Sequence, residues 1–320
     1  MSGSKEHRPA IYRALEEIPA GFGPSVAAIG NFDGVHLGHR EILAAVVAEA
    51  RGRNARAVAI TFDPHPVHFL RPDVPLKLLT PLEERVRLLA GTGLDAVLVL
   101  RFDEALSHLR AREFVERVLV KTLAVQTLHE GGSFRFGYKA EAGVKELAEL
   151  GAECGFALRV HDAVPARGME ISSSAARELV AAGDVRRARW MLGRPFAVRS
   201  KPARGRGVGA RLVVPTVNLA EYDGLLPATG VYVTRLTAGG RCFKSVTNVG
   251  NRPTFAGAGF AVETHILDFE PMELSGDTLL HLEFLLRLRA EMRWPTPEAL
   301  KAQIMKDVQR AQRYFRLAAG

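Results

Sequence analysis

The sequence contains little cysteine and no long apolar run. Cys154 and Cys242 are the only cysteines in 320 residues, and no Cys or His stands near them at a metal-ligand spacing. Two distant cysteines exclude a disulfide framework and are typical of a reducing compartment. No stretch reaches the roughly 20 apolar residues of a membrane helix, and the N-terminus lacks the apolar core of a signal peptide. We therefore expect a cytoplasmic protein without a membrane partner.

Long runs of one charge are also absent. The chain has 43 basic and 35 acidic residues, a net charge of +8. Such an excess favours anionic partners, among them nucleotides, nucleic acid and acidic lipid headgroups. Because both signs are interspersed along almost the whole chain, the excess does not choose among these anions. With 47% apolar residues, the chain can build cores for two ordinary domains.

Strand-like and helix-like stretches alternate in the first half. Short apolar runs predict buried strands at residues 25–29, 57–62, 96–102, 126–129 and 157–164. Helical periods predict helices with Ile42, Leu43, Val46 and Val47 on one face, and over residues 113–123, 141–154, 172–182 and 184–192. Another helix begins near Thr80, with Thr80 as N-cap, Pro81 in the first helical position and Glu83 completing a capping box. This alternation predicts a doubly wound α/β fold, a parallel sheet covered on both faces.

The second half is built from shorter runs rich in Val and Leu, interrupted by Gly and Pro. Residues 232–237 and 241–248 flank a Gly-containing turn and predict a hairpin. Residues 280–289 alternate as a strand does. A last helix enters through Thr296 and Pro297, with Leu300, Ile304, Val308 and Ala311 on one face. We expect a small β-barrel with a closing helix and place the domains at residues 1–192 and 193–320.

The segment from Gly30 to His39 joins a buried strand to a helix. A helix start offers unpaired N–H groups and partial positive charge, and glycines let the backbone approach a ligand. His36 and His39 are three residues apart, so within a helix they share a face and can both reach a phosphate oxygen. A lone Gly-x-x-Gly-His is more often an ordinary turn with solvated histidines, but the full ten residues favour a phosphate site.

These ten residues resemble the His-x-x-His signature of the nucleotidylyltransferase superfamily, and in particular that of the prokaryotic bifunctional riboflavin kinase/FAD synthetase family. Further segments resemble motifs of this family in the same order, at residues 61–66, 134–137, 171–177, 183–184 and 192–195. The resemblance implies that His36 and His39 grip the ATP phosphates. Further phosphate or nucleotide contacts are implied for Gly30, Asn31, Phe32, Asp33, Gly34, Gly38, Asp63, Ser173, Ser174 and Arg177.

The implied reaction in this half is attack by the FMN phosphate on the α-phosphorus of ATP, with pyrophosphate leaving. It needs alignment, Mg²⁺ and cations around the developing charge more than covalent help. Two positions depart from the family pattern: Ser133 replaces an Asn or Asp, and Glu170 replaces a residue that is often basic. Glu170 would repel phosphates if it faced them. On local sequence alone, Asp63 could be a turn residue and the serines near residue 172 an ordinary N-cap.

The second half resembles the kinase part of the same family, a six-stranded type of barrel. Residues 212–218 resemble its Pro-Thr-x-Asn motif, which implies that Thr216 and Asn218 hold Mg²⁺ and phosphate. Residues 262–268 resemble a strand whose Glu is the catalytic base, so Glu263 would take the proton from the ribityl 5′-hydroxyl as it attacks the γ-phosphorus of ATP. A Gly-rich loop, on composition alone a solvated turn, would cover ATP. The implied contacts there are Gly205, Gly207, Gly209 and Pro215.

Further segments of this half resemble family motifs, at residues 227–232, 248–255, 289–294 and 301–307. The kinase half departs from the pattern at Ala210, Val213, Val214 and Val217. Branched side chains stiffen that stretch, and the Mg²⁺ pair and the base are retained.

The resemblance spans about residues 20–315 and implies an enzyme with two sites. One phosphorylates riboflavin to FMN with ATP, and the other adenylylates FMN to FAD, so the partners are small molecules and nucleic acid is disfavoured. Three alternatives stay open: only one active half, a non-catalytic flavin- or RNA-binding regulator, and a pantetheine- or nicotinate-type adenylyltransferase. The last leaves the barrel unexplained, and a regulator has no need of Glu263 beside Thr216 and Asn218. The sequence leaves the oligomeric state open.

Overall fold

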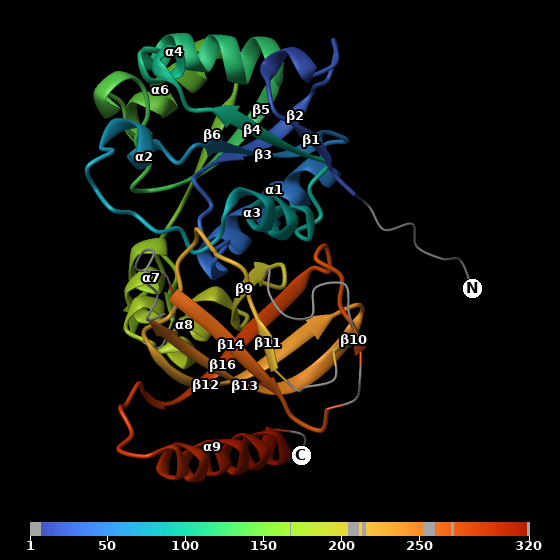
Figure 1. Cartoon of the computed structure of the whole chain (residues 1–320). Coiled ribbons are helices and arrows are strands. Elements are labelled where there is room, and N and C mark those ends of the chain that lie inside the picture. The colour runs from blue at the N-terminus through green and yellow to red at the C-terminus, as the bar shows by residue number, and fades with distance from the viewer. Residues whose placement is uncertain are drawn as a thin grey trace. The chain divides into compact units, whose positions relative to one another are not determined.

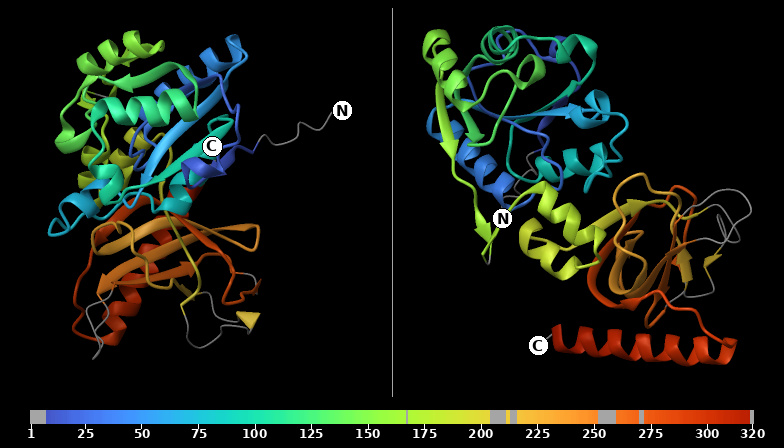
Figure 2. Two further views of the ribbon diagram at one scale, coloured as in Figure 1. Left: turned by 90° about the horizontal axis from the view of Figure 1, so that it is seen from above. Right: turned by 90° about the vertical axis from the view of Figure 1, so that its left-hand side faces the viewer.

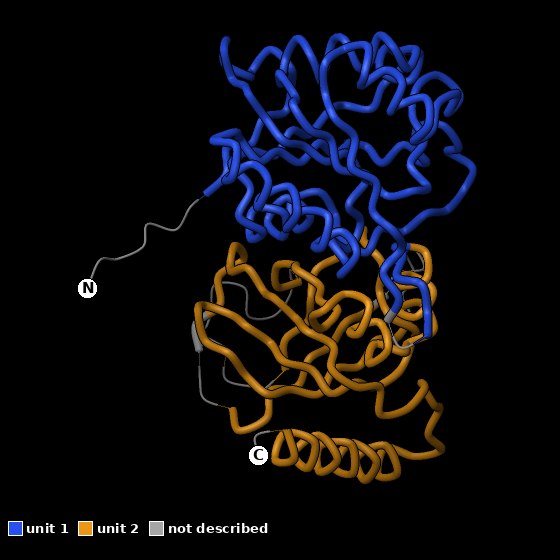
Figure 3. Tube along the Cα trace, turned by 180° about the vertical axis from the view of Figure 1, so that it is seen from behind, with its two compact units in different colours: residues 1–173 blue, residues 174–320 orange. Residues whose placement is uncertain are grey.

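The computed structural model describes residues 8–166, 168–203, 211–212, 216–251, 260–269 and 272–318. The chain divides into two compact units, Met1–Ser173 and Ser174–Gly320 (Figure 3). The sequence placed the domain boundary at residue 192, beyond helices α7 (Ser173–Ala181) and α8 (Val185–Leu192). The compact units place these two helices almost entirely in the second part of the chain, whereas the sequence placed them in the first domain. The domain boundary stays a prediction.

The first unit is built on a six-stranded sheet with the strand order β1-β4-β3-β2-β5-β6. All of its strand pairs are parallel. This arrangement confirms the doubly wound α/β fold that the sequence predicts. The strands are β1 (Ala10–Tyr12), β2 (Ser25–Ile29), β3 (Arg56–Asp63), β4 (Ala96–Arg101), β5 (Val125–Gly131) and β6 (Ala157–His161).

Helices cover both faces of this sheet (Figure 1). On β2, Val26 and Ala28 pack with Leu43 of α1 in one apolar core, while Ala27 and Ile29 join a second core on the opposite face. Every residue of β2 is buried, as expected for a central parallel strand that alternates between two covered faces. The first core takes in α1 (Leu37–Gly52) and α3 (Leu82–Ala90), and the second takes in α5 (Ala111–Phe114), the π-helix η2 (Val115–Thr122) and α6 (Val144–Cys154).

The start of α3 corrects one expectation. Pro81, not Thr80, is the N-cap residue of α3, and no side chain caps the helix. The Thr80 hydroxyl instead accepts a hydrogen bond from the Gly34 amide at 2.8 Å and donates one to Asp33 Oδ1 at 3.2 Å. The helix therefore begins where the sequence predicts, but its supposed cap is used by a loop distant in sequence.

The second unit contains a curled six-stranded antiparallel sheet with the strand order β11-β14-β13-β12-β16-β9 (Figure 2). All of its strand pairs are antiparallel, and this curled sheet confirms the expected barrel-type domain. The strands are β9 (Phe196–Ser200), β11 (Thr216–Asn218), β12 (Gly230–Ala238), β13 (Arg241–Asn251), β14 (Phe260–Ile266) and β16 (Leu280–Ala290).

The expected hairpin joins β12 to β13. Ala238 pairs with Arg241, so Gly239 and Gly240 form a two-residue turn. Their φ angles are 54° and 76°. Left-handed values at both central positions are those of a type I′ turn, whose twist matches that of the strands it joins. The two glycines therefore fix the register of β12 on β13.

A chain of hydroxyl groups lies inside the curled sheet. The Thr234 Oγ1 atom is 2.8 Å from Ser245 Oγ and 2.7 Å from Thr247 Oγ1, which is in turn 3.0 Å from Thr264 Oγ1. All four side chains are buried, and because each hydroxyl has a partner, their burial carries little penalty. Since strand side chains alternate, inward Thr264 and Thr247 leave their neighbours Glu263 and Asn248 on the outer face.

The C-terminal helix α9 (Pro297–Ala318) packs against β12 and β13. Ala311 is buried in this contact, and Asp307, 2% exposed, accepts a hydrogen bond from Arg289 Nε at 2.9 Å. Leu300 and Ile304, however, are 41% and 46% exposed. The apolar face expected from the sequence is therefore not buried in the first two turns. It packs against the sheet only further along the helix.

The remaining elements are short. Among the described residues, no helix combines the length and the apolar character needed to cross a membrane. The short elements are η1 (Leu15–Glu17), α2 (Pro66–Leu70), α4 (Glu104–Ser107), η3 (Tyr138–Ala140), β7 (Pro165–Ala166), β8 (Met169–Glu170), β10 (Arg211–Leu212) and β15 (Met272–Glu273).

Candidate functional site

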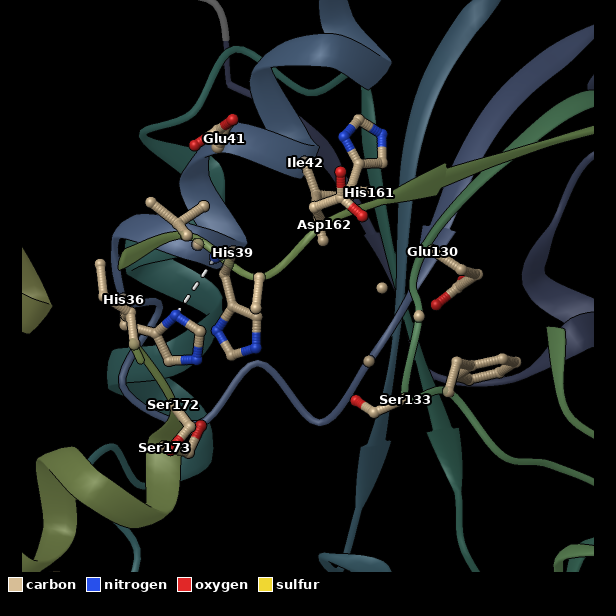
Figure 4. Close-up of a pocket in the computed structure, with 18 of the residues that line it drawn as sticks. His36, His39, Glu41, Ile42, Glu130, Ser133, His161, Asp162, Ser172 and Ser173 are labelled. Atoms are coloured by element: carbon tan, nitrogen blue, oxygen red, sulfur yellow. Dashed lines mark hydrogen bonds between the residues drawn. The ribbon is translucent and has the colours of Figure 1, made fainter. Parts of the chain in front are cut away.

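A cavity of about 520 Å³ opens in the first unit where β2, β5 and β6 end and α1 begins (Figure 4). Ligands of open α/β sheets bind outside the carboxyl ends of the strands, and this volume suits a ligand of drug size. The expected site residues that line the cavity are Gly30, Phe32, His36, Gly38, His39 and Ser173. The structure therefore gathers much of the expected phosphate site in one place.

His36 and His39 lie against each other at the N-terminus of α1. His36 is the N-cap residue, and its Nδ1 accepts a hydrogen bond from the His39 amide at 3.2 Å. The two rings stack with their centroids 3.6 Å apart, and Phe32 meets the His39 ring edge-on at 5.1 Å. Because Nδ1 of His36 accepts, a proton on neutral His36 sits on Nε2. The Nε2–H group of neutral His36 thus lies beside the helix N-terminus.

The His39 ring is partly buried, and the His36 ring is 6% exposed. Burial, and secondarily the neighbouring His36, lowers the pKa of His39 well below its usual value. Its Nδ1 atom is buried and meets no hydrogen-bond partner among the described residues. A neutral imidazole with one unused nitrogen can donate to, or accept from, a ligand in the cavity, and Figure 4 shows both rings facing that space.

The loop before α1 is held in a strained form. Phe32 and Val35 have φ angles of 47° and 37°, values that side chains other than glycine rarely adopt. Both are almost fully buried, at 2% and 1% exposure, so packing maintains the conformation. Such strain persists only where the surroundings determine it, and it is frequent at ligand sites.

The Asp33 carboxylate faces the protein and not the cavity. Its oxygens accept hydrogen bonds from the Leu79 and Thr80 amides at 3.1 and 2.9 Å, and Asp33 is fully buried. The Asp33 carbonyl also accepts a hydrogen bond from Ser173 Oγ at 2.8 Å. Asp33 thus ties the loop to two distant segments, and with its charge turned away it does not line the space expected for phosphates.

Asn31 and Asp63 are placed around a buried arginine that the sequence analysis missed. Arg85 of α3, which is 0% exposed, donates to the Asn31 carbonyl at 2.9 Å and to the Phe62 carbonyl at 2.8 Å. Its guanidinium also lies 3.9 Å from Asp63 Oδ1. Burial lowers the pKa of Arg85, and the charges of Asp33 and Asp63 oppose that effect. Neither Asn31 nor Asp63 lines the cavity, so their nucleotide contacts stay predictions.

A signal for Arg85 was present in the sequence. Leu82, Val86 and Leu89 mark the apolar face of α3, and Arg85 falls on that same face at helical spacing. Charged residues are rarely buried without a partner, so an arginine within an apolar stripe indicates an internal hydrogen-bonding role.

The serines at the N-terminus of α7 line the cavity. Ser172 and Ser173 line it, and so does Glu170 of β8. An acidic group thus borders the space expected for phosphates, at the position where the sequence departs from the family pattern. Ser174 and Arg177 fall in the second compact unit, where Arg177 is 3.5 Å from Ser174 Oγ. Their approach to ATP stays a prediction.

A histidine chain also leads from α1 to the cavity wall. Glu49 Oε2 lies 3.0 Å from His129 Nε2, and His129 Nδ1 lies 2.9 Å from Nε2 of His161, which lines the cavity. Since the carboxylate only accepts, His129 donates from Nε2 and, when neutral, accepts at Nδ1 from His161. Burial is the main cause that lowers the pKa of His129. The sequence analysis assigned no role to these residues.

The expected kinase residues share one face of neighbouring strands in the second unit. Asn218 of β11 pairs with Glu263 of β14, and Thr216 pairs with His265 two residues along. Glu263 also faces Asn248 of β13 on its other side. Directly opposite residues have Cβ atoms about 5 Å apart, and Thr216, Asn218 and Glu263 are all exposed. The register thus brings together the three side chains that the sequence singled out and adds Asn248, which it did not.

Part of the expected kinase site lies outside the described residues. This applies to Gly205, Gly207, Gly209 and Pro215, and to residues 252–255 of the segment 248–255. Within the described residues, no group of three or more His, Cys, Asp or Glu side chains could hold a metal ion.

Comparisons with known proteins agree with the two units. A family model described as FAD synthetase matches residues 19–175, and one described as riboflavin kinase matches residues 192–315. The bifunctional riboflavin kinase/FMN adenylyltransferase of Escherichia coli K12 is 37% identical over 295 residues, covering 91% of this chain and 93% of that protein. The enzyme of the same description from Pseudomonas fluorescens is 36% identical over 307 residues, covering 94% and 96%.

A solved structure resembles the whole chain. The crystal structure of a macrolide-efflux protein from Streptococcus pneumoniae superposes with a TM-score of 0.83 at 24% identity, covering 95% of this chain and 98% of that one. At this identity the likeness shows the fold alone.

Proposed function

The chain belongs to the family of bifunctional riboflavin kinase/FMN adenylyltransferases, and from that premise we propose which residues carry each activity. The protein is a transferase that uses ATP twice. In one reaction the γ-phosphoryl group passes to riboflavin, giving FMN and ADP. In the other the adenylyl group passes to FMN, giving FAD and pyrophosphate. The observation that carries the assignment of residues is the pairing of His36 with His39 at a cavity in the first unit.

The adenylyl transfer takes place in the cavity of the first unit. His36 and His39 donate hydrogen bonds to phosphate oxygens of ATP, next to the free amides at the start of α1. Gly30 and Gly38 line the cavity, and because they carry no Cβ the nucleotide can approach the backbone there. Ser173, Ser174 and Arg177 hold the leaving pyrophosphate. Donors fixed in position before the reaction stabilise charge without reorganising.

The phosphoryl transfer takes place on the outer face of β11 and β14. Glu263 removes the proton of the ribityl 5′-hydroxyl as that oxygen attacks the γ-phosphorus, and ADP leaves. Thr216 and Asn218 offer hydroxyl and amide oxygens on the exposed edge strand, an oxygen donor set that suits Mg²⁺. When bound there, Mg²⁺ neutralises charge on the ATP phosphates.

The cytoplasm is the proposed location. Both cysteines are free thiols, Cys154 partly buried and Cys242 exposed, and an exposed thiol is suited to a reducing compartment. The partners are the small-molecule substrates ATP, riboflavin and FMN.

A single assay tests the two activities. Purified protein is incubated with riboflavin, ATP and Mg²⁺, and the flavins are separated by chromatography. We expect FMN to appear first and FAD to follow. Formation of FMN without FAD would rule out the adenylyltransferase activity, and unchanged riboflavin would rule out the kinase activity. Omitting Mg²⁺ and adding a chelator should stop FMN formation if the metal role is correct.

Two variants test the assignment of the sites. Glu263→Gln removes the proposed base at nearly constant shape, and the kinase kcat should fall by about 100-fold or more, with FMN-to-FAD conversion retained. The paired substitution His36→Ala/His39→Ala should give the opposite result. Each variant controls for the folding of the other, and loss of both activities in either one would contradict the two-site assignment.

A further inference from the structure

Glu130 is a buried carboxyl group on the wall of the adenylyl-transfer cavity. It follows His129, the last residue of β5 that pairs with β2, and it is 3% exposed. Its Oε1 atom accepts a hydrogen bond from the Ile29 amide at 2.7 Å. Glu130 thus satisfies the first amide of β2 beyond the last residue pair between β2 and β5. Because side chains alternate along a strand, Glu130 shares a face with Leu128 of the apolar core.

No cation accompanies this carboxyl group. Among the described residues, the Ile29 amide is the only hydrogen-bond partner of the Glu130 side chain, and no Lys, Arg or His forms an ion pair with it. An ionised carboxylate that is buried without a cation is strongly disfavoured. Burial accordingly raises the pKa of Glu130 well above its usual value, against the opposing effect of the Ile29 amide. Burial without a cation thus favours the protonated form of Glu130 over a wider pH range than for an exposed glutamate.

A protonated carboxyl group has a donor as well as an acceptor. Its Oε1 atom is engaged by Ile29, so the hydroxyl on Oε2 is the group left for a ligand. The neighbouring lining residues are Ile29, the glycines at 131 and 132, Ser133 and Phe134. This part of the wall is suited to a flat ring and not to phosphates, whose place is at the histidine pair and the start of α1.

We propose that the Glu130 carboxylic acid donates a hydrogen bond to an acceptor on a planar heteroaromatic ring of the substrate, and so positions that ring for adenylyl transfer. This inference rests on the proposed function of the cavity. Two substrates offer the required acceptor: the flavin of FMN through a ring carbonyl, and the adenine of ATP through a ring nitrogen. Glu130 is a positioning residue that takes no part in bond making.

Ionisation provides a way to remove the donor alone. As pH rises through the pKa of Glu130, the hydroxyl is lost while Oε1 can still accept from Ile29. Glu130→Gln keeps both a donor and an acceptor at every pH. Above the pKa of Glu130, the KM of the wild type for one of the two substrates should therefore rise by about 3- to 10-fold, the size expected for one hydrogen bond. The same KM of Glu130→Gln should not rise.

Other titratable groups line the same cavity and are present in both proteins, so they cancel in the comparison. A matched control is Glu41→Gln, an exposed glutamate of the same cavity wall, which should keep the alkaline rise of the wild type. The titratable groups on the other elements around the cavity are His36, His39, Glu41, His161, Asp162 and Glu170.

The experiment measures FMN adenylylation against pH with each substrate varied in turn. An alkaline rise in KM for FMN identifies the flavin as the ring, and a rise for ATP identifies adenine. Equal profiles for the wild type and Glu130→Gln would overturn the inference, as would an equal rise for both substrates, which indicates a merely structural effect. Kinase activity in the same samples verifies folding. If the wild type makes no FAD, the proposed function itself fails.

A stability measurement tests the protonation state independently. The folded protein binds the Glu130 proton more tightly than the unfolded chain, so the stability from this group is full below the unfolded pKa of about 4.3. It is lost as pH rises toward the folded pKa. In urea titrations, the wild type should lose stability relative to Glu130→Gln over that interval. A constant difference would show that Glu130 is ionised and would overturn the inference.

Discussion

At the scale of single residues, the two histidines of the phosphate loop have different environments. The His36 ring is fixed by the bond that its Nδ1 accepts from the His39 amide, whereas the His39 ring is held by stacking and by Phe32. The low pKa of His39 means that the folded protein prefers the neutral ring. The positive charge that phosphates meet therefore comes from the start of α1 and from cations, more than from His39.

The pH dependence of stability tests this view of His39. The folded pKa is depressed, so the stabilising contribution of neutral His39 is present above the unfolded pKa of about 6.5 and is lost as pH falls toward the folded pKa. Urea titrations at pH 7.5 and at lower pH values should show that the free energy of unfolding falls less for His39→Gln than for the wild type. Parallel curves for the two proteins would contradict the assignment.

Arg85 gives a second prediction at this scale. Arg85→Met removes one donor from each of the Asn31 and Phe62 carbonyls, while Asn31 keeps the hydrogen bond from Thr61 Oγ1 at 3.2 Å. The expected loss of stability is about 1 to 3 kcal/mol in total. We expect a lower melting temperature and a higher KM for ATP in FAD formation, with kinase activity unchanged. Arg85→Lys is the matched control, because it keeps the charge but cannot bind both carbonyls in a fork. Its melting temperature and its KM for ATP should lie between those of the wild type and Arg85→Met. A kinase defect of similar size would argue against a local effect.

At the scale of helices and strands, the sequence predicts the elements well and their contacts poorly. Apolar runs and helical periods fix β2, β3, β4 and α1 because burial on both sides of a sheet leaves a strong pattern. Thr80 has the local features of a helix cap, yet Asp33 and Gly34 bind it, and that depends on which strands are neighbours in the sheet. Glu130 was missed for the same reason, whereas Arg85 left a signal in its place on the apolar face of α3. The family resemblance supplied Glu263, Thr216 and Asn218, which carry no periodic signal of their own.

Substitution of Thr80 distinguishes a helix cap from a loop tie. Thr80→Val leaves the Gly34 amide without its acceptor and should destabilise the protein by about 1 to 3 kcal/mol. Thr80→Ser keeps the hydroxyl and should restore most of the loss. Hydrogen exchange locates the effect: faster exchange at Gly34 supports the loop tie, whereas faster exchange confined to the first turn of α3 would indicate a cap.

At the scale of the whole molecule, each unit has its own apolar core and its own candidate site. The cores on the two faces of the parallel sheet contain residues of the first unit only, and the core beneath α9 contains residues of the second unit only. FMN made in the kinase unit is the substrate of the other unit, so it has to leave one site before it enters the next.

Mixing the two single-site variants tests whether FMN passes through solution. A mixture of Glu263→Gln with His36→Ala/His39→Ala should convert riboflavin to FAD, although neither protein does so alone. We expect a lag that shortens as the protein concentration is raised, because free FMN must accumulate. If each variant keeps its own activity and the mixture still makes no FAD, FMN is retained by the protein that forms it.

The inward turn of Asp33 has a thermodynamic consequence for nucleotide recognition. Because this carboxylate, Thr80 and Ser173 hold the loop before any nucleotide arrives, the conformational entropy of the loop is lost during folding and not during binding. Titration calorimetry of ATP should therefore show no large unfavourable entropy from this site. A loop of this kind discriminates by shape, so triphosphate analogues with a bulky bridging group should be rejected.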